Sequence, residues 1–177
     1  MTNHDSTSRA AVHLPAGLPA WTLRAAAAIT CAAIAFLMAA NGIQGISLIL
    51  FGVVSLAAVA VPASAAPALV IGFAAIAVAF TDGTPFRPSV LLLIPLFHLL
   101  HTTCAIAALT PQRSRLHPAA LKVPARRFAR TQLLVFVLVG VTALLPAGGT
   151  EPVVEAAGLL TAAALAVAAV VLTRPKR

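Results

Sequence analysis

Long runs of apolar residues, separated by short polar turns, restrict the fold of this chain more than any other feature. Six such runs cover residues 23–40, 43–61, 66–80, 89–109, 128–145 and 152–172. All but the third approach the ~20 residues that a helix needs to cross ~30 Å of hydrocarbon. Charged residues make up 9% of the chain, far below the roughly 25% of an ordinary soluble domain. We therefore predict an all-α, polytopic transmembrane helix bundle with six spans, or with five if the third run does not cross.

Positive charge is concentrated in the connection between the fourth and fifth runs. This connection, residues 110–130, contains no acid and carries six cations: Arg113, Arg115, Lys122, Arg126, Arg127 and Arg130. Cations in short loops mark the cytoplasmic side of a membrane, so we predict that these residues lie inside and contact lipid or a partner. Arg9 and Arg24 keep the N-terminus on the same side. Two further spans return the C-terminus to it, so both termini are predicted to be cytoplasmic.

The chain divides into one membrane domain and two short tails. Residues 1–20 are polar and lack a periodic apolar pattern, which predicts a disordered cytoplasmic tail. Residues 21–173 form the predicted transmembrane domain, and residues 174–177 form a basic cytoplasmic tail. Trp21 at the start of the first run marks the membrane interface, where aromatic side chains are enriched.

The net charge of +8 raises the question of nucleic-acid binding. The cations lie between apolar runs instead of along one face, and few aromatic residues are present to stack on bases, so we predict no nucleic-acid partner. The expected partners are the lipid bilayer, anionic lipids at the cytoplasmic face, and other membrane proteins or a second copy. Cys31 and Cys104 lie inside apolar runs and are predicted to be reduced, small hydrophobic residues. No cofactor or metal is predicted.

One polar cluster lies inside an apolar run and is the candidate intramembrane site. It consists of His98, His101, Thr102 and Cys104. At about 100° per residue the two histidines lie some 60° apart on one helix face, and ionisable residues within a membrane suggest function. A proton relay, a metal pair and axial haem ligation are the functional interpretations. The structural interpretation, which we favour, is that neutral imidazoles bond to carbonyls, including the Leu91 carbonyl that Pro95 leaves unpaired.

The depth of His98 predicts its state. It lies about ten residues, hence ~15 Å, from the outer end of its span. Desolvation at that depth disfavours a charged imidazole, so we expect a neutral side chain turned toward another helix. Thr30 and Cys31 of the first run are the candidate neighbours.

Two short stretches suggest an internal repeat. Residues 47–51 (SLILF) align with residues 132–136 (QLLVF), and the same offset aligns Pro67 with Pro152. Three spans followed by three would form an inverted repeat, an architecture found among transporters. Alanine-rich stretches such as residues 25–28 allow close helix approach, which favours helix association in lipid.

The stretch from residue 98 to residue 128 carries a resemblance to known proteins. Its elements are His98-Leu99-Leu100-His101, Arg113, Leu116, Ala119-Ala120-Leu121 and Arg126-Arg127-Phe128. In these residues the chain resembles small alanine-rich multi-pass membrane proteins of actinobacteria, whose functions are largely unassigned. The resemblance implies a bacterial cytoplasmic membrane and brings no site residue with it.

The sequence lacks the motifs of common catalytic sites. It contains no Walker lysine in a glycine-rich loop, no HExxH, no GxSxG and no paired aspartates within a span, so we do not expect an enzyme. Our leading hypothesis is a non-catalytic integral membrane subunit or scaffold of a larger membrane protein complex. The alternatives are a small transporter or channel with a 3+3 inverted repeat, and a proton-relay or haem- or metal-binding redox subunit that uses His98 and His101.

Overall fold

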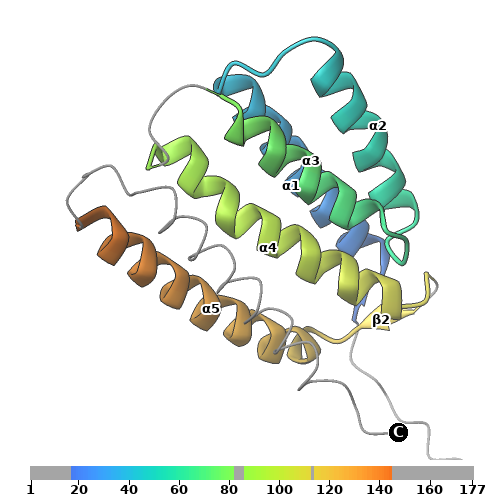
Figure 1. The fold of residues 1–177 in the computed structure, drawn as a ribbon. Coiled ribbons are helices and arrows are strands. Elements are labelled where there is room, and N and C mark those ends of the chain that lie inside the picture. Colours follow the sequence, from blue (N-terminus) through green and yellow to red (C-terminus); the bar gives the residue numbers. More distant parts are fainter. Residues whose placement is uncertain (1–16, 82–85, 113, 145–177) are drawn as a thin grey trace, which may run out of the picture. The chain divides into compact units, whose positions relative to one another are not determined.

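The computed structural model describes residues 17–81, 86–112 and 114–144, and most of these residues are helical. They form the helices α1 (Trp21–Ala40), α2 (Ile46–Ala60), α3 (Ala66–Ala79), α4 (Pro88–Leu109) and α5 (Pro118–Leu144), shown in Figure 1. The prediction of an all-α chain is confirmed for this part, and each of the first five apolar runs corresponds to a helix. The sixth run, residues 152–172, lies outside the described residues, as do the predicted tails 1–16 and 174–177.

Two very short strands tie the α4–α5 connection to the start of α1. Strand β1 (Leu18–Pro19) pairs antiparallel with β2 (Arg115–Leu116), with Leu18 opposite Leu116. The backbone N–H of Ala20 extends the pairing by donating to the Ser114 carbonyl at 3.2 Å. The last residues of the predicted tail are therefore part of a strand pair. We call the end of the molecule that holds these strands the strand end.

Successive helices run in opposite directions, as Figure 1 shows. The start of α1, the end of α4 and the start of α5 consequently lie at the strand end, and the α1–α2 and α3–α4 turns lie at the opposite end. The described residues up to Leu138 belong to one compact unit. Within it the most extensive helix contact joins α1 to α4, and α2 packs mainly on α3.

Glycine conformation explains why α2 begins later than the apolar run. Asn41 ends α1, and its side-chain Nδ2 donates to the Leu37 carbonyl at 2.7 Å. Gly42 and Gly45 then adopt positive φ angles of 86° and 64°, a region that glycine enters without steric cost. The turn therefore occupies the residues up to Gly45, and α2 starts at Ile46 instead of residue 43.

The start of α5 corrects the prediction for the basic connection. The helix begins at Pro118 instead of at residue 128, so Lys122, Arg126, Arg127 and Arg130 lie on a helix and not in a loop. Proline fits the first helical turn because its missing N–H needs no partner there. The alanines and leucine that follow favour the helix. Pro124 lies inside the helix, where a proline removes one backbone hydrogen bond and crowds the carbonyl four residues earlier.

The core lies between α1, α2, α3 and α4. Ile34, Met38, Val70 and Leu100 are fully buried. Phe51 is also buried and stands against Phe73 with ring centroids 6.4 Å apart. Ala58 and Ala74 have no exposed surface, and small side chains at such positions let helix backbones approach closely.

The surface of the helices is apolar. Of the described helices, α1 and α4 are long and apolar enough to cross a membrane, whereas α2 and α3 are apolar but shorter, ~22 and ~21 Å by the helical rise. In the apolar 18-residue stretch of each of these two helices, 33% is buried in α1 and 28% in α4. The core helix of a soluble protein, in contrast, is mostly buried. The described helices do not support a count of six spans.

Candidate functional site

His98 of α4 faces Gln132 of α5 across the seam between the two helices. The side-chain Nε2 of Gln132 lies 2.7 Å from Nδ1 of His98. The Phe128 ring covers the imidazole with a centroid distance of 4.8 Å and an interplanar angle of 33°. Gln132 is buried and His98 is half-buried. A polar pair thus joins α5 to α4.

The orientation of the Gln132 amide determines where the imidazole proton lies. When the amide N–H donates to Nδ1, that ring nitrogen is the acceptor and the ring N–H lies on Nε2. The carbonyl oxygen Oε1 of Gln132 is buried and has no hydrogen-bond partner among the described residues. A buried carbonyl oxygen without a partner is uncommon, so this amide retains unused capacity to accept a hydrogen bond.

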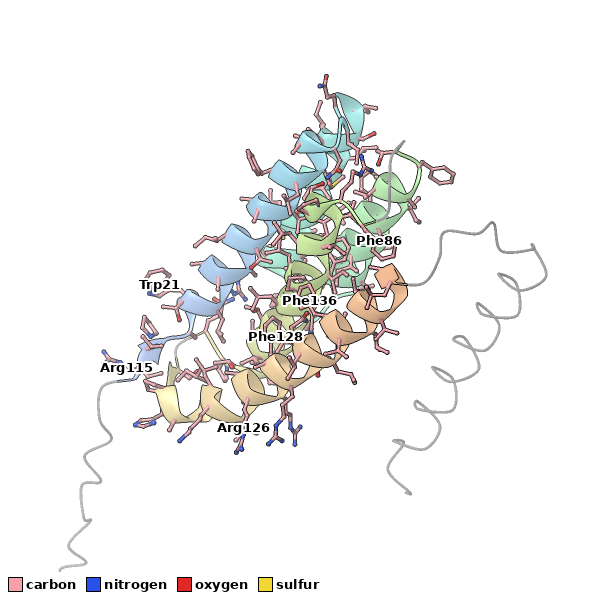
Figure 2. All side chains as sticks on the ribbon, turned by 90° about the vertical axis from the view of Figure 1, so that its left-hand side faces the viewer. Trp21, Phe86, Arg115, Arg126, Phe128 and Phe136 are labelled. Carbon is pink, nitrogen blue, oxygen red and sulfur yellow. The ribbon has the colours of Figure 1, made fainter. Side chains whose placement is uncertain are left out.

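The helix α5 lies loosely along α4, with few close backbone approaches, and Phe128 lines two hollows beside it. One hollow of about 280 Å³ is partly polar and is lined by His98, Thr102, Val123, Pro124, Arg127, Phe128 and Thr131. The other, of about 270 Å³, reaches α1 and is mainly apolar, with Leu23, Leu99 and Leu121 in its wall. Figure 2 shows Phe128 directed toward the other helices and Arg126 directed away from them.

The four residues of the predicted polar cluster do not converge. His98 faces α5, His101 is exposed, Thr102 is half-buried and Cys104 is buried in the core. The Thr102 hydroxyl donates to the His98 carbonyl at 2.8 Å, within the same helix. Cys104 and Cys31 are both free and buried. The residues share a helix, but only His98 contacts the neighbouring α5 through its side chain by a hydrogen bond.

The partner of His98 differs from the one expected. The Leu91 carbonyl stands seven residues away along α4, ~10.5 Å at the helical rise, which is beyond the reach of the imidazole. Thr30, a candidate neighbour on α1, instead donates its hydroxyl to the Ala26 carbonyl at 2.8 Å. Among the described residues, the hydrogen bond of the imidazole is instead with the Gln132 side chain.

The cations predicted to contact lipid or a partner lie at or toward the strand end. Arg115, Lys122, Arg126, Arg127 and Arg130 are exposed, and Arg113 lies outside the described residues. Residues 17–81, 86–112 and 114–144 contain no aspartate or glutamate, so none of these cations is paired with an acid within that part of the chain. At the opposite end the described residues carry one cation, Arg87.

Sequence reasoning did not identify Gln132 as a site residue. The available signal was an amide inside an apolar run, because polar side chains within a membrane are costly and often functional. Two polar contacts at the end opposite the strands were also missed. The Ser89 hydroxyl donates to Asn41 Oδ1 at 2.9 Å, and Arg87 donates to the Thr81 hydroxyl at 3.0 Å.

The described residues thus fold into helices apart from the short β1–β2 pair, with two helices long and apolar enough to cross a membrane and a polar pair between α4 and α5. Within the described ranges no three histidine, cysteine, aspartate or glutamate side chains come together as metal ligands. Comparison with protein-family models, with curated proteins and with solved structures found no match to the chain.

Proposed function

We propose that the chain is a multi-pass protein of the bacterial cytoplasmic membrane and a non-catalytic subunit or scaffold of a larger membrane protein complex. The observation that carries this proposal is the apolar outer surface of α1, α2 and α3. Ile29, Phe36, Leu56, Leu69 and Ile76 are all more than half exposed. Exposed apolar surface of this extent marks a membrane or protein interaction.

The distribution of cations supports an orientation. Of the described cations, all except Arg87 lie at or toward the strand end. Positive charge is enriched on the cytoplasmic side, which favours a cytoplasmic strand end and a cytoplasmic N-terminus. The alternating directions of α1 to α5, followed by the apolar run at residues 152–172, would then give six spans and a cytoplasmic C-terminus.

The first half of α5 is suited to contact an anionic surface. Lys122, Arg126 and Arg130 recur every fourth residue and are exposed, so they share one helix face. Cations near an anionic leaflet contribute ~1 kcal/mol each. We propose that this basic face contacts anionic lipid headgroups or a membrane partner at the cytoplasmic side.

The geometry gives less support to the two alternatives. In the proposed 3+3 repeat Phe51 aligns with Phe136, yet Phe51 is buried and Phe136 is 41% exposed. A redox or proton-relay role would use His98 and His101 together, but His98 is bonded to Gln132 and His101 is exposed. Neither alternative has a specific observation in its favour.

Purification of the tagged full chain from bacterial membranes tests the proposal. We expect the protein to remain in membranes after an alkaline wash, and to elute from a mild detergent column with another membrane protein or with itself in fixed ratio. Cross-linking before extraction and mass spectrometry would identify the partner. A pure monomer that carries ions across vesicle membranes, or that shows a haem absorption band, would overturn the subunit proposal.

A further inference from the structure

We propose that a cleft between the last turns of α3 and the first turns of α4 binds an acyl chain of an anionic phospholipid, with Arg87 holding the lipid phosphate. The site lies at the end opposite the strands and is separate from the basic face of α5. The inference rests on the proposed placement of the chain in a membrane.

The cleft is apolar and has a volume of about 280 Å³. Its lining residues are Ala75, Val78, Ala79, Thr81, Arg87, Val90, Leu93, Ile94 and Phe97. The α4 residues recur at the spacing i, i+3, i+4 and i+7, so they form one helix face. Opposite them α3 presents Ala75 and Ala79, whose small side chains leave the space open. The volume is close to the lower limit of ~300 Å³ for small-molecule pockets.

Arg87 lies at one end of this cleft and has an unused donor. Its Nη2 donates to the Thr81 hydroxyl at 3.0 Å, and that hydroxyl in turn donates to the Val78 carbonyl at 2.7 Å. Arg87 Nε is buried and has no hydrogen-bond partner among the described residues. A buried donor without an acceptor is destabilising, especially on a charged group. The Arg87 side chain is therefore held in place by Thr81 and still requires an acceptor.

A phosphate from outside the described residues satisfies this requirement. The described ranges contain no acid, and Asp82, the acid nearest in sequence, lies outside them. A guanidinium presents parallel N–H groups that match two oxygens of a phosphate. Arg87 is also the residue that precedes the first turn of α4, where the helix dipole favours an anion.

The apolar walls identify the anion as part of a lipid. A free phosphate would satisfy Arg87 but would leave the surface of Val90, Ile94 and Phe97 uncovered. An acyl chain attached to the same phosphate covers that surface, and both parts of a phospholipid are present at a membrane interface. The apolar cleft and Arg87 together thus match a phospholipid, in which the phosphate headgroup and the acyl chain are covalently joined.

The test measures lipid retained by the full-length protein in a non-ionic detergent. Protein is mixed with equal amounts of phosphatidylglycerol and phosphatidylcholine, stripped by excess detergent, and analysed by native mass spectrometry. We expect the last lipid retained to be phosphatidylglycerol. Arg87→Gln keeps a donor for Thr81 but removes the charge, so retention should weaken about tenfold, the loss typical of one charge-assisted hydrogen bond.

Matched variants separate a specific site from general attraction. Ala75→Leu fills the cleft without changing charge and should also displace the last lipid, whereas Ala57→Leu places the same side chain on an exposed position of α2 and should not. Arg126→Gln removes the same charge as Arg87→Gln from the basic face of α5 and should leave the last lipid bound. Inorganic phosphate should not compete.

Two results would overturn the inference. One is unchanged retention of phosphatidylglycerol in both Arg87→Gln and Ala75→Leu, and the other is equal retention of phosphatidylcholine. If Arg87→Gln does not fold, Ala75→Leu alone decides between these outcomes. If a variant loses the bound lipid but remains in membranes after an alkaline wash, the lipid site is lost and the proposed membrane function is unaffected. If the protein is not found in membranes at all, that function is contradicted.

Discussion

The side-chain amide of Gln132 and the imidazole of His98 form a polar pair at 2.7 Å between α5 and α4. Few close backbone approaches join these helices, so side chains provide most of the contact. Phe128 adds a ring contact at 4.8 Å on the same imidazole. In lipid the hydrophobic effect does not drive helices together, and polar side chains between helices supply part of the association.

A double-mutant cycle on this pair should show coupling. We expect His98→Leu and Gln132→Leu each to lower the free energy of unfolding by roughly 1 kcal/mol, with a coupling energy of about 0.6 kcal/mol, the average for hydrogen bonds within membranes. His98→Asn should preserve assembly, because an amide still donates and accepts. Unfolding in mixed micelles of increasing dodecyl sulfate content measures these energies.

The control for the cycle is Leu133→Ala, next to Gln132 in sequence but exposed on α5, which should not couple to His98→Leu. If the losses in unfolding free energy for His98→Leu and Gln132→Leu simply add, the hydrogen bond does not stabilise the contact between α4 and α5. Normal assembly of His98→Asn with loss of proton flux or bound metal would support the relay or metal interpretation instead.

Gly17→Ala should open the strand pair. A Cβ at this position would stand 2.9 Å from the Leu116 carbonyl oxygen, which is backbone and has little freedom to move. We expect faster hydrogen exchange at the Ala20 amide, whose bond to the Ser114 carbonyl depends on this pairing. Deletion of residues 2–13 stops short of Gly17 and should leave exchange, membrane insertion and thermal stability unchanged. Equal exchange in wild type and Gly17→Ala would contradict the pairing.

Gly45→Ala and Gly52→Ala should have opposite effects on the free energy of unfolding. Gly45 has a positive φ of 64° with ψ at −133°, a region that residues with a side chain rarely adopt, so alanine there should cost roughly 1–3 kcal/mol. Gly52 lies inside α2 with open space where a Cβ would stand, and alanine there should stabilise by roughly 0.5–1 kcal/mol because glycine weakens helix interiors. Thermal unfolding in detergent compares the two. A stabilising Gly45→Ala would show that the α1–α2 turn has another conformation.

Apolar runs predicted the helices well where turn residues bound them. The third run, residues 66–80, matches α3 at Ala66–Ala79, and the fourth, residues 89–109, matches α4 at Pro88–Leu109. The start of α5 was missed because cations and prolines are typical of loops. At Pro118 the proline instead occupies a first turn, where it is well tolerated.

The site was predictable only in part. The position of His98 inside an apolar run identified it as a candidate, but its contact with Gln132 joins residues 34 apart in the sequence and depends on how α5 docks. The bond between Ser89 and Asn41 spans 48 residues and is equally invisible to local patterns. Periodicity specifies which residues share a helix face, whereas the pairing of faces follows from packing.

Reporter insertion at the two ends of the helical unit tests the central claim, a membrane-spanning bundle whose strand end is cytoplasmic. A fluorescent protein that folds only in the cytoplasm is inserted after Gln112, and a phosphatase that is active only outside is inserted after Thr81. Each reporter is exchanged at the other position as a control. We predict fluorescence at Gln112, phosphatase activity at Thr81, and neither signal after the exchange. The same reporter active at both positions, or the chain recovered without membranes, would contradict the account.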